Sequence, residues 1–127
     1  MKTITVTRKK KFAGAVMPYW VITGVSKSSF CSRYNLSGDL CEQSENGFPI
    51  PRIDMKVLDE IGMRISNGET ISIELKEDET TLFASTADGC LSNEVQLNDY
   101  WQAGLKITIT TKGGFKTLPH PVIEKPN

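Results

Sequence analysis

Three cysteines and a single histidine are the side chains that most suggest a reactive site. A thiol becomes a nucleophile when a base such as imidazole takes its proton, and the same residue types bind zinc. Their spacing fits neither use, because the first two cysteines lie ten residues apart and the histidine stands between two prolines. We therefore expect packed thiols and a surface imidazole at Cys31, Cys41, Cys90 and His120.

Other cofactor patterns do not fit this sequence either. The aspartates do not follow a calcium-loop template. A phosphate-binding loop must lead into a helix, and no helix is predicted after Gly113-Gly114. The sequence thus predicts no cofactor and no metal. The odd cysteine count favours free thiols in a reducing compartment, although a bridge between any two of the three stays open. A small cysteine-dependent enzyme is kept as an alternative function.

Aromatic side chains are the stronger indication of a binding surface. Tyr19-Trp20 and Tyr100-Trp101 are adjacent pairs, and Tyr34 lies near a possible helix end. Exposed Trp and Tyr stack on sugar rings or anchor a protein partner. In an extended strand one member of each pair points inward, and we expect Trp20 and Trp101 to favour the core. The candidate binding residues are Tyr19, Tyr34, Tyr100 and Trp101, whichever stay exposed.

The densest basic segment is Arg8–Lys11, yet the 15 basic and 15 acidic residues of the chain cancel. A nucleic-acid binder usually carries a positive excess that releases phosphate counterions, so nucleic acid is disfavoured as the partner. We interpret the segment as the solvated end of a strand rather than as a surface for phosphates or an acidic membrane.

The length of 127 residues fits one domain, residues 1–127, with enough surface to bury a core. No apolar run approaches the roughly 20 residues that span a bilayer. The first residues reach the basic cluster without the apolar region of a signal peptide, so we expect a cytoplasmic protein.

The strands that position these residues are predicted from the alternation of apolar and polar side chains along the sequence. Ile71, Ile73 and Leu75 alternate with polar residues, which predicts a strand with one buried face. The Asn67-Gly68 pair before it favours a two-residue hairpin turn, with Met63–Ser66 as the partner strand.

Further strands are predicted at roughly eight- to twelve-residue spacing, which is typical of a sandwich or barrel. Ser26 is a candidate cap for a short helix, and the segment 54–61 fits a helix or a strand. Residues 118–127 are predicted to be a tail, although Phe115–Ile123 also fits an edge strand. The fold class we expect is an all-β antiparallel β-sandwich of about seven strands, with a short helix in a long insertion over residues 26–52. The other strands are expected at Thr3–Arg8, Tyr19–Thr23, Thr81–Thr86, Glu94–Leu97 and Leu105–Thr110.

The strand rhythm of residues 64–110 resembles small bacterial β-sandwich domains of the PEGA type. The resemblance implies an accessory domain with no catalytic residues to carry over. It is carried by Arg64–Glu69, Ile71–Leu75, Leu82–Thr86, Asp88-Gly89, Asn93–Leu97 and Leu105–Ile109.

These observations together favour a non-catalytic binding or protein-interaction module. Its surface would be the insertion loop plus the exposed aromatic residues, because loops on a rigid sheet commonly carry binding sites. The expected ligand is a protein or a carbohydrate. A third function is a structural subunit that forms homo-oligomers through an edge strand, either Thr3–Arg8 or Phe115–Ile123.

Overall fold

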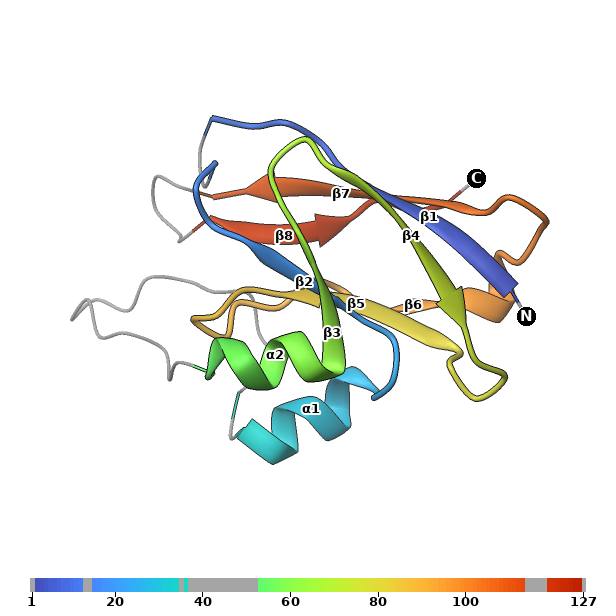
Figure 1. The fold of residues 1–127 in the computed structure, drawn as a ribbon, viewed down its shortest axis with the longest axis horizontal. Helices are drawn as coiled ribbons and strands as arrows, with labels where there is room; N and C mark the ends of the chain where they lie inside the picture. Colours follow the sequence, from blue (N-terminus) through green and yellow to red (C-terminus); the bar gives the residue numbers. More distant parts are fainter. Residues whose placement is uncertain (1, 13–14, 35, 37–52, 114–118, 127) are drawn as a thin grey trace.

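The computed structural model describes residues 2–12, 15–34, 36, 53–113 and 119–126. These residues form two four-stranded sheets and two short helices (Figure 1), which confirms a sheet-rich fold. The elements are β1 (Lys2–Arg8), β2 (Tyr19–Ile22), α1 (Lys27–Tyr34), α2 (Met55–Ile61), β3 (Gly62–Ile65), β4 (Thr70–Leu75), β5 (Thr81–Ser85), β6 (Val95–Gln96), the 3₁₀ turn η1 (Leu97–Asp99), β7 (Lys106–Lys112) and β8 (His120–Ile123).

The first sheet has the strand order β4-β1-β7-β8. β1 lies inside it, antiparallel to β4 with Ile4 opposite Ile73, and parallel to β7 with Val6 opposite Ile107. The expectation that β1 forms a sheet edge is therefore wrong. The expectation that all strands pair antiparallel is also wrong, because β1 and β7 are parallel. Strand alternation shows which face is buried, but it does not show which strands become neighbours.

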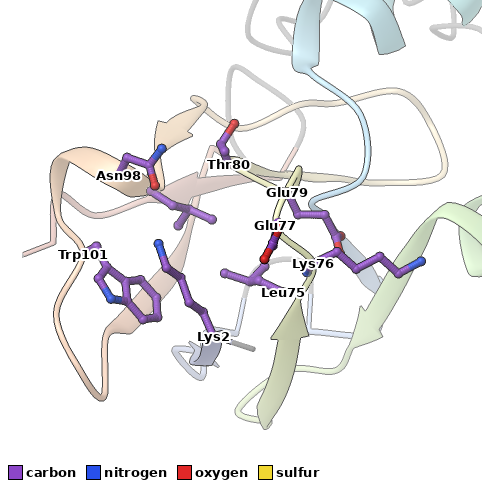
Figure 2. Close-up of a pocket in the computed structure, with 9 residues that line it drawn as sticks. Lys2, Leu75, Lys76, Glu77, Glu79, Thr80, Asn98 and Trp101 are labelled. Carbon is purple, nitrogen blue, oxygen red and sulfur yellow. Dashed lines mark hydrogen bonds between the residues drawn. The ribbon is translucent and has the colours of Figure 1, made fainter.

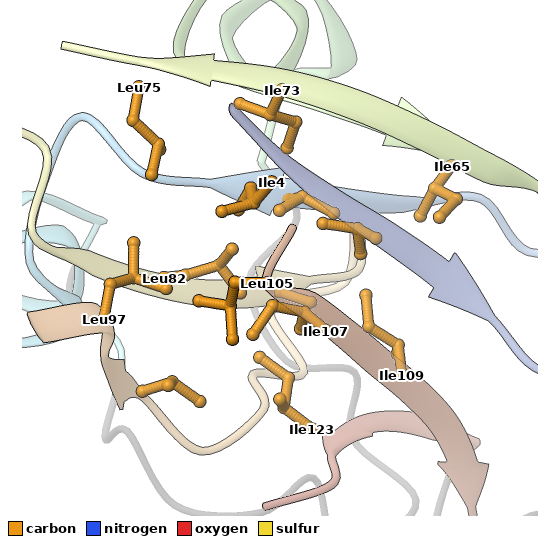
Figure 3. Close-up of a cluster of buried hydrophobic side chains, with 14 of the residues drawn as sticks. Ile4, Ile65, Ile73, Leu75, Leu82, Leu97, Leu105, Ile107, Ile109 and Ile123 are labelled. Carbon is orange, nitrogen blue, oxygen red and sulfur yellow. The ribbon is translucent and has the colours of Figure 1, made fainter. Parts of the chain in front are cut away.

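The second sheet has the order β3-β2-β5-β6 and is antiparallel throughout the described strands. Its inner strands bury both faces: in β5, Leu82 and Ala84 face the first sheet while Phe83 faces the helices. Side chains of both sheets share one hydrophobic cluster (Figure 3), which includes Ile4, Val6, Val21, Ile65, Ile73, Leu75, Leu82, Leu105, Ile107, Ile109 and Ile123.

The two helices pack on the other face of the second sheet (Figure 1). α1 begins as predicted, because the hydroxyl of Ser26 accepts the Ser29 N–H at 3.2 Å and so caps the first turn. Its Phe30 is fully buried, with its ring centroid 5.3 Å from that of Phe83. The ambiguous segment 54–61 is helical, since Asp54 caps α2 by accepting the Lys56 N–H.

The turn at Asn67-Gly68 is a corner between the sheets rather than a hairpin. β3 pairs with β2 and β4 pairs with β1, so the hairpin prediction is wrong. Gly68 has φ +78°, and the Glu69 N–H donates to the Ser66 carbonyl at 3.0 Å. The dipeptide reverses the chain as expected, but the turn itself does not choose the partner strand.

Two further expectations concern the chain ends and the cysteines. Of the two structures left open for the C-terminal segment, the described part forms an edge strand, β8. The expectation of free thiols is wrong for Cys90, which is disulfide-bonded, and right for Cys31. Residue counts do not reveal which thiols the fold brings within bonding distance. Cys41 and most of the predicted insertion, residues 37–52, lie outside the described residues.

None of the described helices has the length and apolar character needed to cross a membrane.

Candidate functional site

An open cavity of about 520 Å³ lies at the end of the molecule where β1 begins (Figure 2). This volume falls within the roughly 300–1,000 Å³ typical of small-ligand sites. Its lining comes from the start of β1, the end of β4, the β4–β5 turn and the η1 region, and includes Lys2, Leu75, Glu77, Leu97, Asn98 and Trp101. Leu75 and Leu97 are almost fully buried, so they form an apolar floor.

Trp101 forms one wall of the cavity. Its ring is half-buried against the core between the sheets, which fixes its position while leaving part of it open to solvent. The Lys2 ammonium lies 4.7 Å from the ring centroid, within the range of a cation–π contact (Figure 2). Trp101 thus has both the anchoring and the exposure that a stacking platform requires.

The opposite side of the cavity is polar and carries charges of both signs. The Glu79 carboxylate accepts the Thr23 hydroxyl at 2.5 Å and the Lys76 N–H at 2.9 Å, so both of its oxygens are engaged by the protein. Glu77 and Asn98 are exposed at the rim. With two lysines and two glutamates in the lining, the cavity has no formal charge excess.

The four predicted binding residues do not share one surface. Tyr19 is fully buried, its hydroxyl hydrogen-bonded to that of Thr111 at 2.7 Å. Burial raises the pKa of Tyr19, which therefore stays protonated. Tyr34 packs beside Phe30 on α1, with ring centroids 4.9 Å apart. Since Tyr19 is a core residue and Tyr34 is partly covered by the helix layer, neither contributes to the cavity.

Tyr100 and Trp101 are adjacent in sequence but line different hollows. Tyr100 borders a shallow depression with Val95 and Ile123, whereas Trp101 borders the main cavity. Trp101 is thus the one predicted binding residue that lines the cavity. Strand alternation favoured a core position for Trp101, but the residue is only partly buried. Lys2, Glu77 and Asn98 carry no sequence signal, because the fold brings them together from distant segments.

Trp20 is a core residue, as expected, and is fully buried. Its indole N–H donates to the Asp59 carboxylate at 2.7 Å, and Arg64 bridges the same carboxylate at 3.0 Å. These contacts attach α2 to the second sheet. The hydrogen bond from Trp20, together with the nearby guanidinium, lowers the pKa of Asp59.

Cys31 and His120, which the structure describes, do not form a catalytic pair. Cys31 lies on α1, against one face of the second sheet, whereas His120 is buried on β8 at the edge of the first sheet. Desolvation raises the pKa of Cys31, and Glu94 adds to this rise while Lys27 opposes it. A nucleophilic thiol needs the opposite shift, so these surroundings do not favour Cys31 as a nucleophile.

Metal ligation has no visible basis in the part of the chain that the structure describes, where no three His, Cys, Asp or Glu side chains gather.

Comparison with protein families, curated proteins and solved structures found no match to this chain. The resemblance to PEGA-type domains therefore stays a prediction.

Proposed function

We propose that this protein is a non-catalytic binding module that takes a small neutral ligand in the cavity beside Trp101. The observation that carries the proposal is the combination of an indole wall, an apolar floor and a polar rim in one open hollow. Binding sites for small molecules typically combine apolar surface with a few polar groups that fix orientation.

The chemistry of the lining favours a saccharide among the ligand classes. A sugar presents an apolar face that stacks on an indole, and hydroxyl groups that both donate and accept hydrogen bonds. Glu77 and Asn98 supply acceptors and Lys2 a donor around Trp101. The balance of charges favours a neutral sugar over an anionic one, because no cationic excess is present to attract an anion.

We also propose that the two sheets form a β-sandwich, with the cavity at one end and the helices covering the second sheet. Their shared apolar cluster supports this arrangement, since facing sheets bury their inner side chains against each other. An accessory domain of the kind that the PEGA-type resemblance implies is compatible with such a site.

Replacement of Trp101 by alanine tests the proposed function. A glycan array and a peptide library are screened with the wild type, and the affinity of any neutral saccharide found is measured by calorimetry. We expect Trp101→Ala to weaken binding by about fivefold or more, because loss of an aromatic stacking platform typically costs about 1–3 kcal/mol.

Tyr100→Ala is the matched control, since Tyr100 is the neighbouring aromatic residue and borders a different depression. It should leave saccharide affinity within about twofold, the range of substitutions without a direct contact. Binding of peptides alone, or equal losses in the two variants, would refute the assignment.

A further inference from the structure

We propose that the described residues 9–12 and 15–16 after β1, here called the basic loop, dock this protein onto an anionic lipid surface. The loop presents the two most exposed large apolar side chains among the described residues, Phe12 at 100% and Val16 at 95%. Both follow the basic segment Lys9–Lys11. Apolar side chains flanked by lysines are the combination that penetrates a membrane interface while its cations meet anionic headgroups.

Hydrogen bonds to the corner between the sheets hold the basic part of this loop in place. The Lys11 N–H donates to the side-chain oxygen of Asn67 at 3.0 Å, and the Asn67 amide donates to the Lys11 carbonyl at 3.1 Å. The Ala15 N–H donates to the Phe12 carbonyl at 3.2 Å. The fold therefore presents Phe12 instead of folding it back onto the core.

The local charge matches an anionic surface. Lys10 and Lys11 are exposed, and neither forms an ion pair with another described residue. Lys9 pairs with Glu124 at 2.6 Å, so its charge is compensated. The parallel pairing of β1 with β7 brings the exposed Lys112 to the same end of the molecule.

The corner that holds the loop also contains an acidic side chain. Glu69 of the same corner accepts the Ser66 N–H at 2.8 Å. Its negative charge is outnumbered by the positive charges of Lys10, Lys11 and Lys112, so the charge at this end is positive, although the whole chain is neutral.

A bilayer fits this surface better than a nucleic acid does. A nucleic-acid site would pair the lysines with aromatic rings for base stacking; of the two exposed apolar side chains only Phe12 is such a ring, whereas Val16 is aliphatic. An aliphatic and an aromatic side chain that both protrude into solvent gain free energy by entering the boundary between headgroups and acyl chains. Figure 1 shows the end of β1 that leads into this loop at the opposite end of the strand from the N-terminus.

Vesicle flotation tests the proposal with the full chain. The vesicles contain either phosphatidylcholine alone or phosphatidylcholine with about one-third phosphatidylserine, a strongly anionic composition. We expect flotation with the anionic vesicles only, and its loss at high salt. The double variant Lys10→Gln/Lys11→Gln should lower the partition coefficient roughly 20- to 30-fold, because each lysine near such a surface contributes about fivefold.

The apolar contribution is tested separately. Phe12→Ser should lower the partition coefficient about tenfold or more, because the ring no longer enters the interface. In a Phe12→Trp variant, the fluorescence should shift to the blue with anionic vesicles and be quenched by brominated acyl chains, relative to the wild type. The substituted side chains are exposed, so circular dichroism should show an unchanged fold.

The matched control is Lys56→Gln/Met63→Ser, which removes an exposed lysine and an exposed apolar side chain from α2 and β3. It should float like the wild type. Three results would overturn the proposal: no flotation of the wild type, equal loss in the control, or binding to a DNA duplex without binding to vesicles.

Discussion

At the scale of single residues, Arg8 shows how this fold accommodates a buried cation. Its guanidinium donates to the Met17 carbonyl at 2.6 Å and the Ile65 carbonyl at 3.1 Å, and it lies 3.7 Å from the centroid of the Tyr19 ring. A buried charge is tolerated only when hydrogen bonds and nearby dipoles replace its hydration. Arg8 thereby connects the end of β1 to both strands of the neighbouring sheet edge, β2 and β3, and fixes where the exposed lysines begin.

Asp59 provides a prediction at this scale. Its pKa is lowered in the folded state, so as the pH falls the unfolded chain takes up the proton first. The stability that the ionised carboxylate contributes is therefore complete above the ordinary aspartate pKa of about 4 and is lost as the pH falls through the lowered value. Asn resembles the protonated form, because its amide oxygen still accepts the Trp20 N–H.

We expect Asp59→Asn to be less stable than the wild type at pH 7, and this difference to shrink to zero toward pH 2. Urea unfolding followed by tryptophan fluorescence at a series of pH values measures it. Glu60→Gln on the same helix is the control, since Glu60 has no hydrogen bond to Trp20 among the described contacts. A difference that stays constant with pH would contradict the role given to the ionised carboxylate.

At the scale of elements, Gly62 allows α2 to pass directly into β3. An added Cβ would lie 2.9 Å from the Val21 carbonyl oxygen and 2.9 Å from the Ile22 side chain. A contact that short with backbone must move β2 or α2, and overpacking of this kind typically costs about 1–3 kcal/mol. We expect Gly62→Ala to lower the free energy of unfolding by that amount in urea titrations.

Gly24→Ala is the matched control, because an added Cβ there meets only the Glu79 carboxylate at 3.9 Å. Its effect should stay within about 0.5 kcal/mol, as for most surface substitutions. Equal stability of the two variants would mean that the α2–β3 junction is looser than the contacts indicate.

The elements were largely predictable from the sequence, whereas their partners were not. Alternation placed β1, β4 and β7, because the burial of every second residue is a local property. Asn67-Gly68 predicted a reversal but not the change of sheet that follows it. The parallel pairing of β1 with β7 joins strands about a hundred residues apart, and no local pattern encodes such a contact.

The same limit applies to the candidate site. Trp20 and Trp101 both follow a tyrosine, yet one is fully buried and the other lines a cavity. What separates them is the layer that covers each ring: α2 lies over Trp20 and supplies Asp59, whereas Trp101 follows η1 at an open end of the core. The cover over each ring depends on tertiary structure, which the sequence pattern does not show. The aromatic residues therefore gave four candidates, of which the fold places one in the cavity.

At the scale of the whole molecule, the two proposed surfaces lie at opposite ends of β1. Lys2 at its start lines the cavity, and Arg8 at its end leads into the basic loop. The strand between them spans about 20 Å at the usual rise per residue. It is paired on both sides, and its Ile4 and Val6 are fully buried. In the proposed arrangement, the protein binds a membrane through the basic loop and its cavity faces away from the membrane.

This geometry predicts that ligand binding and vesicle binding are independent. The two charged regions are separated by more than the Debye length of about 10 Å at 0.1 M salt, and the strand that joins them is paired on both sides. The affinity for a saccharide identified by the array should therefore change by less than about twofold when anionic vesicles are added. Likewise, Trp101→Ala should leave flotation unchanged, and Phe12→Ser should leave saccharide affinity unchanged. A mutual change of tenfold or more would reveal coupling between the ends, and would place the movable element in β1 or in the corner at Asn67 that holds the loop.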